Sequence, residues 1–260
     1  MILEFLTILE NEWWVILLFL IVAIIYASVG FGGGSSYLAI LALSAMAYTE
    51  IRAMALICNI VVVSGNVLIY QKQKILEWKK IIPLVSLSIP FAYLGGFLKI
   101  NEYVFFTLLS ITLLFAAFTM WFSTVTEVTS SINKKNDTVK NSLYGAIVGF
   151  LSGMVGIGGG IFLAPLLHVT RWDISKKIAA TASFFILVNS IAGLFGQFTN
   201  SNFVLNWKLT IILAFTVFIG GQIGGILSAK KLSAVQLKKA TALLIAFVSI
   251  RILWKVFLTF

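Results

Sequence analysis

Apolar runs alternate with short polar stretches along the whole chain, in two sets of five. The first set is 13–29, 35–47, 53–70, 81–98 and 103–122, and the second is 142–155, 161–169, 178–198, 209–229 and 237–260. A helix needs about 20 apolar residues to cross a bilayer. The pattern predicts an all-α polytopic membrane protein with two transmembrane repeats, residues 1–122 and 141–260, joined by a cytoplasmic linker at 123–140.

Each set opens with two apolar runs separated by a cluster of glycines. We name Gly30-Phe31-Gly32-Gly33-Gly34 the first glycine cluster and Gly156-Ile157-Gly158-Gly159-Gly160 the second. Glycines loosen a helix and free backbone N–H groups, which at membrane depth need a partner. The helices that restart at Ser35 and Ile161 direct N–H groups and a positive dipole end into the membrane. Each cluster therefore predicts part of an anion site, and the short flanking runs predict a helical hairpin that is either re-entrant or makes two full crossings.

A second shared motif indicates that the two sets are repeats. Leu94-Gly95-Gly96-Phe97-Leu98 matches Ile223-Gly224-Gly225-Ile226-Leu227, and we interpret these glycines as close helix packing. An odd number of segments in each repeat makes the two repeats inverted in the membrane. Inverted repeats with broken helices are typical of transporters that alternate access around a midplane site.

Composition agrees with a membrane protein and suggests its orientation. The chain is 60% hydrophobic and 11% charged, with a mean hydropathy of +1.04. Its net charge of +10 comes from lysines and arginines in short loops, which positive-inside topology explains better than nucleic-acid binding. The acidic N-terminus, with Glu4, Glu10 and Glu12, is then outside. We expect an integral multi-pass protein of the plasma membrane. In a cell with two membranes, this is the inner membrane.

Polar residues on the helix after each hairpin are candidates to bind the anion. They extend the predicted substrate site, which comprises Gly30, Gly32, Gly33, Gly34, Ser35, Asn59, Asn66, Gly156, Gly158, Gly159, Gly160, Thr181, Ser183 and Asn189. Hydrogen bonding between helices is the alternative role for each polar side chain. Gln197 and Gln222 are weaker candidates.

Other residue types exclude several classes of chemistry. One cysteine, Cys58, and one histidine, His168, leave no disulfide framework and too few ligands for zinc. The carboxylates fall in loops or at segment edges, which excludes a mid-membrane carboxylate relay. We therefore expect neither an enzyme nor a bound cofactor. An anion leaving a negative cell interior gains about 2.3 kcal/mol per charge per 100 mV, so export needs no coupling ion.

The paired glycine clusters resemble the sulfite exporter TauE/SafE family of membrane permeases. Ala180-Thr181-Ala182-Ser183, followed by Val188-Asn189-Ser190-Ile191-Ala192-Gly193, is similar to that family's small-polar helix, whereas Ala53 and Ala55 depart from it in the first half. The resemblance implies export of sulfite, sulfoacetate or a related organosulfonate. The alternatives are import of such anions coupled to protons or sodium and, less favoured, a membrane-embedded enzyme.

Overall fold

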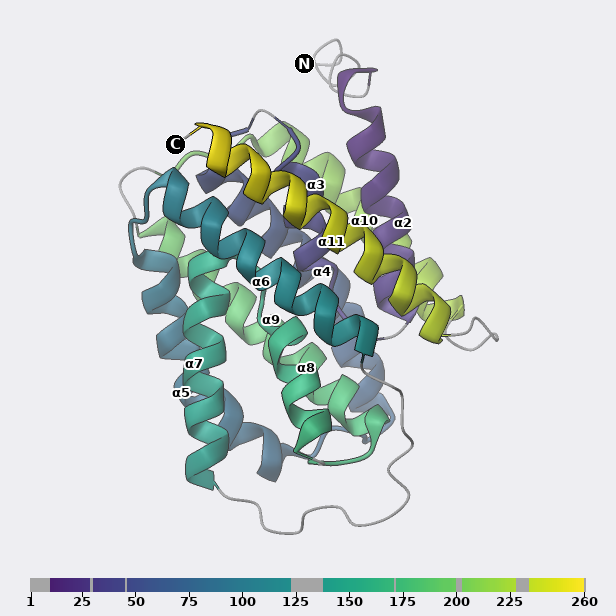
Figure 1. Cartoon of the computed structure of the whole chain (residues 1–260). Helices are drawn as coiled ribbons and strands as arrows, with labels where there is room; N and C mark the ends of the chain where they lie inside the picture. Colours follow the sequence, from purple (N-terminus) through teal and green to yellow (C-terminus); the bar gives the residue numbers. More distant parts are fainter. Residues whose placement is uncertain are drawn as a thin grey trace.

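The computed structural model describes residues 10–28, 30–44, 46–122, 138–170, 172–199, 203–227 and 234–259, and within these ranges all regular secondary structure is helical (Figure 1). The helices of the first half are α2 (Trp13–Ser28), α3 (Gly34–Leu41), α4 (Tyr48–Lys72), α5 (Trp78–Phe97) and α6 (Glu102–Phe122). Those of the second are α7 (Thr138–Val155), α8 (Gly160–Val169), α9 (Ser175–Phe198), α10 (Trp207–Leu227) and α11 (Ala234–Thr259). The expected all-α class is confirmed.

Five helices in the described part of the chain are long and apolar enough to cross a membrane. They are α4, α5, α9, α10 and most of α6. By contrast α2, α3 and α8 have 16, 8 and 10 residues, which is short of the roughly 20 that a crossing needs. The chain is therefore an integral membrane protein in which the glycine clusters separate short helices.

The glycine clusters break the helices through backbone conformations that other residues rarely adopt. Gly30 has a φ of 82°, and Gly156, Gly158 and Gly159 have φ of 87°, 84° and 83°. The helices restart at Gly34 and Gly160, one residue before the expected starts. Among the described residues, the second cluster thus contains three glycines in the left-handed conformation, and the first cluster contains one.

Glycines also bring helices of opposite halves into close parallel contact. On α7, an added Cβ would overlap successive carbonyl groups of α5: Gly145 with Leu84, Gly149 with Ser88, and Gly153 with Ala92. On α10, Gly220 lies against Leu20 and Gly224 against Ile24, both of α2. Because the partners advance together along both helices, α7 runs parallel to α5 and α2 runs parallel to α10.

The packing role expected for the second glycine motif holds for three of its four residues. An added Cβ would overlap the carbonyl oxygen of Phe150 at Gly95, of Gly193 at Gly96 and of Ile24 at Gly224. Gly225 differs, because its nearest neighbour would be the Ile69 side chain at 3.9 Å, an ordinary contact.

The main helix contacts between the first half and the second have counterparts in which the two halves change places. Helix α5 packs on α7 and α9, and correspondingly α10 packs on α2 and α4. Helix α4 packs on its counterpart α9, and α6 on its counterpart α11. The main apolar core accordingly contains residues of both halves.

Two sets of contacts define the ends of the helix bundle. Lys80 pairs with Asp173 at 2.5 Å, and Ser142 Oγ donates to the Pro83 carbonyl oxygen at 2.9 Å. The α4–α5 connection, the α8–α9 connection and the start of α7 therefore share one end, which we name the Lys80 end. It is the lower end in Figure 1.

The opposite end is defined by two tyrosines. The Tyr48 hydroxyl donates to the Ile100 carbonyl oxygen at 2.8 Å, and the Tyr93 hydroxyl donates to Thr199 Oγ1 at 3.2 Å. We name this the Tyr48 end. It carries the start of α4, the end of α9 and hence the start of α10. Because α2 runs parallel to α10 and α3 leads to α4, the α2–α3 hairpin opens toward the Tyr48 end, whereas α7–α8 opens toward the Lys80 end.

Candidate functional site

The two glycine clusters meet at Asn59 of α4. The Asn59 side chain is fully buried, and its Nδ2 donates to the Ile157 carbonyl oxygen at 2.9 Å. An added Cβ at Gly32 would lie 2.6 Å from Asn59 Oδ1, and one at Gly158 would lie 2.8 Å from Asn59 Nδ2. Asn59 thus lies between the first cluster and the second.

A reciprocal bond comes from the other half. Ser183 of α9 donates to the carbonyl oxygen of Gly30, while Asn59 of α4 donates to that of Ile157. Each long helix that follows a hairpin therefore holds the glycine cluster of the opposite half. The two candidate residues form a pair that fixes the clusters relative to each other.

Backbone donors at this meeting point have no acceptor. The N–H groups of Gly32, Gly33 and Gly34, and those of Gly158, Gly159 and Gly160, make no hydrogen bond within the part of the chain that the structure describes. Such groups are costly at membrane depth. A partner that supplies acceptor oxygens would satisfy them.

Buried side-chain atoms without a partner surround the same point. Asn59 Oδ1, Ser152 Oγ and Ser190 Oγ are buried and have no hydrogen-bond partner among the described residues. An added Cβ would lie 2.8 Å from Ser190 Oγ at Gly158 and 3.3 Å from Ser152 Oγ at Gly159. Buried polar atoms are rarely left unpaired, so this concentration marks a polar site. Ser152 was absent from the sequence-based set.

The clusters are tightly packed in this conformation. An added Cβ would lie 2.5 Å from the Tyr37 ring at Gly33 and 2.8 Å from the Phe185 ring at Gly159. Tyr37 is itself stacked on Phe19, with ring centroids 4.5 Å apart. The site therefore has no room for a methyl group at these two positions.

Four other sequence candidates lie outside the meeting point or are bonded elsewhere. Ser35 lies 3.4 Å from the Tyr26 hydroxyl within the first hairpin. Asn189 Nδ2 donates to the Phe185 carbonyl oxygen of its own helix. Thr181 is buried in α9. Asn66 lies farther along α4, beside α10.

Arg52 is a buried cation whose burial the sequence did not reveal. It lies near the start of α4, at the Tyr48 end, and is only 3% exposed. Its Nη2 donates to the Gly153 carbonyl oxygen at 3.1 Å and lies 3.5 Å from those of Gly95 and Gly96. Among the described residues, no carboxylate lies within ion-pair distance of Arg52. Among the described residues its positive charge is therefore solvated by carbonyl oxygens and not by an anion. It lies close to Gly156, whose added Cβ would meet the Arg52 backbone.

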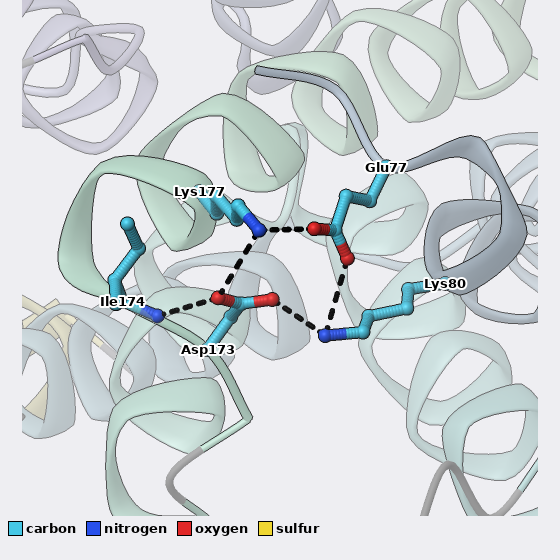
Figure 2. Close-up of polar contacts among 5 residues, drawn as sticks. All are labelled: Glu77, Lys80, Asp173, Ile174 and Lys177. Atoms are coloured by element: carbon cyan, nitrogen blue, oxygen red, sulfur yellow. Dashed lines mark hydrogen bonds and ion pairs between the residues drawn. The ribbon is translucent and has the colours of Figure 1, made fainter. Parts of the chain in front are cut away.

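Four charged residues join the halves at the Lys80 end (Figure 2). Lys80 lies 2.5 Å from Asp173 and 3.2 Å from Glu77, and Lys177 pairs with Glu77 and lies 3.8 Å from Asp173. Asp173 is 1% exposed and also accepts the Ile174 N–H at 2.8 Å. We name these four residues the ion-pair cluster. The hydrogen bond from Lys177 lowers the pKa of Glu77 below its ordinary value.

The described residues contain no group of three or more metal-binding side chains. Cys58 is fully buried in the apolar core. The groups that the described residues bring to the meeting point are backbone, hydroxyl and amide groups, with the Arg52 guanidinium nearby. Such groups can bind an oxyanion without a covalent step.

Similarity to known proteins covers almost the entire chain. The family model described as "Sulfite exporter TauE/SafE" matches residues 15–252. The "probable membrane transporter protein y4hK" of Sinorhizobium fredii is 31% identical over 238 residues, 91% of this chain and 96% of that protein. The "probable membrane transporter protein MJ0441" of Methanocaldococcus jannaschii is 27% identical over 178 residues, 64% of this chain and 65% of that protein. No solved structure matches the chain significantly. The chain therefore belongs to the sulfite exporter TauE/SafE family of membrane transporters.

Proposed function

We propose that this protein exports a small sulfur-containing oxyanion, such as sulfite or an organosulfonate, across the plasma membrane. The observation that carries the proposal is the meeting of the two glycine clusters at Asn59, with six backbone N–H groups lacking acceptors among the described residues. Neutral donors can bind an oxyanion without the full positive charge that would retain it. We therefore expect modest affinity.

We further propose that the halves are inverted repeats that alternate access around this site. The supporting observations are the exchanged contacts and the two hairpins, which open toward opposite ends. Because the clusters are packed too tightly for a ligand, substrate binding requires the hairpins to move apart. Separation toward one end at a time would expose the site to one side of the membrane.

The proposed orientation places the Lys80 end in the cytoplasm and the N-terminus outside. The α4–α5 and α8–α9 connections carry basic residues and lie together at the Lys80 end, as positive-inside topology requires. A negative cell interior then drives an anion outward by about 2.3 kcal/mol per charge per 100 mV. Arg52, with no described carboxylate partner, makes the interior favourable to anions.

The proposal is tested by efflux of radiolabelled sulfite from proteoliposomes that contain the purified protein, with a membrane potential of either sign and no pH gradient. We expect saturable efflux that accelerates when the loaded side is negative. Flux that occurs only with a proton or sodium gradient would support the coupled importer instead. Absence of flux with sulfite, sulfoacetate and thiosulfate under both polarities would overturn the proposed substrate class.

A further inference from the structure

One face of α4 carries three buried polar residues at a constant spacing. Arg52, Asn59 and Asn66 follow one another at seven-residue intervals and are 3%, 0% and 6% exposed. Seven residues make two helical turns, or about 10 Å of rise. The three side chains therefore share a face that runs from the Tyr48 end, through the glycine clusters at Asn59, toward the Lys80 end.

A cavity of about 150 Å³ lies beside Asn66, between α4 and α10. Its lining residues are Val61, Val62, Gly65, Asn66, Ile69, Phe218, Gly221, Gln222 and Gly225. The Asn66 Nδ2 atom is buried and has no hydrogen-bond partner in the part of the chain that the structure describes. Across the cavity, Gln222 Nε2 would lie 3.6 Å from an added Cβ at Gly65. The cavity thus has amide groups on both walls, and one donor is unsatisfied.

The corresponding interface in the other half is closed. There, between α5 and α9, an added Cβ would overlap the Gly193 carbonyl at Gly96 and the Tyr93 carbonyl at Gly196. Between α4 and α10, added Cβ atoms at Gly221 and Gly225 would meet their nearest neighbours at 3.8 and 3.9 Å. The cavity therefore belongs to the α4–α10 interface alone of these two. The glycine motif shared by α5 and α10 does not by itself produce it, because the α5–α9 interface carries the same motif and is closed.

We propose that this cavity is an anion-binding vestibule on the route between the Lys80 end and the glycine clusters. The amide N–H groups of Asn66 and Gln222 donate to the oxygens of a sulfonate or sulfite. The apolar walls accommodate the carbon portion of an organosulfonate, and the described lining contains no carboxylate to repel the charge. Asn66 then passes the anion to Asn59, two turns away on the same face. This inference rests on the proposed anion transport.

The vestibule is tested by thiol labelling of the full chain in nanodiscs, where both membrane faces are accessible. Gly225→Cys places a thiol in the cavity lining without removing either amide. It is treated with the anionic reagent 2-sulfonatoethyl methanethiosulfonate, and Ile223→Cys, two residues away on an exposed apolar surface, is the control. The only native cysteine, Cys58, is fully buried and sets the background. We expect Gly225→Cys to react about tenfold faster than the control, because the reactive thiolate forms in water and not in lipid. Equal rates would overturn the vestibule.

Occupancy is tested by protection with sulfoacetate. We expect sulfoacetate to slow labelling of Gly225→Cys, in which Asn66 and Gln222 are both retained, and the added Asn66→Leu or Asn66→Asp substitution to abolish that protection while labelling continues. The gel-filtration profile identifies any variant that fails to fold, and two different substitutions keep the test available. Protection that persists in both folded variants would overturn the role of Asn66, and absence of protection in Gly225→Cys itself would overturn the vestibule.

Lipid is a competing occupant of the cavity, because a phosphate headgroup offers the same oxygen acceptors as a sulfonate. Nanodiscs of phosphatidylcholine are therefore compared with nanodiscs that also contain phosphatidylglycerol. If phosphatidylglycerol alone slows labelling as strongly as sulfoacetate does, the occupant is lipid and the proposal fails. Efflux by the wild type is measured in parallel. Efflux without protection contradicts the vestibule alone, whereas protection without efflux contradicts the transport function and leaves an anion-binding cavity.

Discussion

At the scale of single residues, polar side chains on the long helices decide how the glycine clusters are held. Asn59 and Ser183 each donate to a carbonyl group of the opposite half's cluster. Both bonds use cluster carbonyl groups, whereas the N–H groups of Gly32–Gly34 and Gly158–Gly160 have no acceptor among the described residues. The proposed oxyanion would bind these N–H groups. The clusters also need glycine for packing, because a side chain at Gly33 or Gly159 would displace an aromatic ring. We therefore expect a bulky side chain at either glycine to abolish flux. Substitution of the polar residues tests the binding role more directly.

Replacement of Asn59 by leucine is expected to reduce transport strongly. It removes the donor to Ile157 and the buried amide between the clusters, and lost hydrogen bonds of this kind cost about 1 kcal/mol or more. Initial rates of sulfite efflux check this, normalised to protein in the membrane. Asn101→Ala is the matched control, since Asn101 is exposed and accepts the Val104 N–H at the start of α6. Normal flux in Asn59→Leu would place the substrate elsewhere.

Arg52 offers a test of electrostatics that separates charge from hydrogen bonding. Arg52→Lys keeps the positive charge, whereas Arg52→Gln keeps donors but removes the charge from a site without a described carboxylate. We expect the glutamine variant to lose about tenfold in initial anion flux and the lysine variant to retain more, because a buried charge raises the local anion concentration. Flux is measured as a function of sulfite concentration. Equal effects of both substitutions would assign Arg52 a structural role.

At the scale of elements, glycines set how closely helices of opposite halves approach. Helix α7 presents Gly149 to the Ser88 carbonyl of α5, and three such contacts in register hold the two helices parallel. Small residues permit this approach in membranes, where packing and not water release holds helices together. The α4–α10 interface lacks comparable contacts at Gly221 and Gly225, and the cavity lies there.

Alanine at Gly149 should destabilise the protein, whereas alanine at Gly225 should be tolerated. At Gly149 the new methyl would lie 2.5 Å from the Ser88 carbonyl oxygen, but at Gly225 the nearest atom is 3.9 Å away. Overpacking of this kind costs about 1–3 kcal/mol. Thermal unfolding in detergent is the measurement, with a lower midpoint expected for Gly149→Ala alone. Similar midpoints for both variants would contradict the close α5–α7 packing.

At the scale of the whole molecule, the halves form one interlocked body with two distinct ends. The ion-pair cluster joins the α4–α5 and α8–α9 connections (Figure 2), although these lie in different halves of the chain. Asp173 is buried in that cluster, so removal of its partners would leave a costly unpaired charge. The cluster stabilises the junction of the halves at the Lys80 end.

The contribution of Glu77 should depend on pH in a defined direction. Because its folded-state pKa lies below the ordinary value of 4.5, ionised Glu77 stabilises the protein at pH values above 4.5. That stabilisation is lost as the pH falls through the lower folded-state pKa. The wild type should therefore unfold at a higher temperature than Glu77→Gln at pH 7, and the difference should shrink below pH 4.5. A difference that is independent of pH would show that the charge of Glu77 does not matter.

Several features of this protein follow from short segments of sequence. Hydropathy determined the all-helical class, and the glycine clusters determined where helices break, because each depends on about 20 neighbouring residues or fewer. The helix restarts at Gly34 and Gly160 were located to within one residue for the same reason. The expected hairpin of residues 142–169 begins and ends on the same side, and the contacts of Ser142 and Lys80 agree with it.

Other features arise only where distant segments meet. No local pattern showed that Asn59 would bond to Ile157, that Arg52 would be buried against three glycine carbonyls, or that Asp173 would be enclosed by two lysines. The seven-residue spacing of Arg52, Asn59 and Asn66, which places them on one helix face, was a sequence signal that could have linked them. Which face becomes buried, and which of two similar interfaces stays open, depends on side-chain volumes contributed by both halves. That balance of volumes exists only in the assembled tertiary structure.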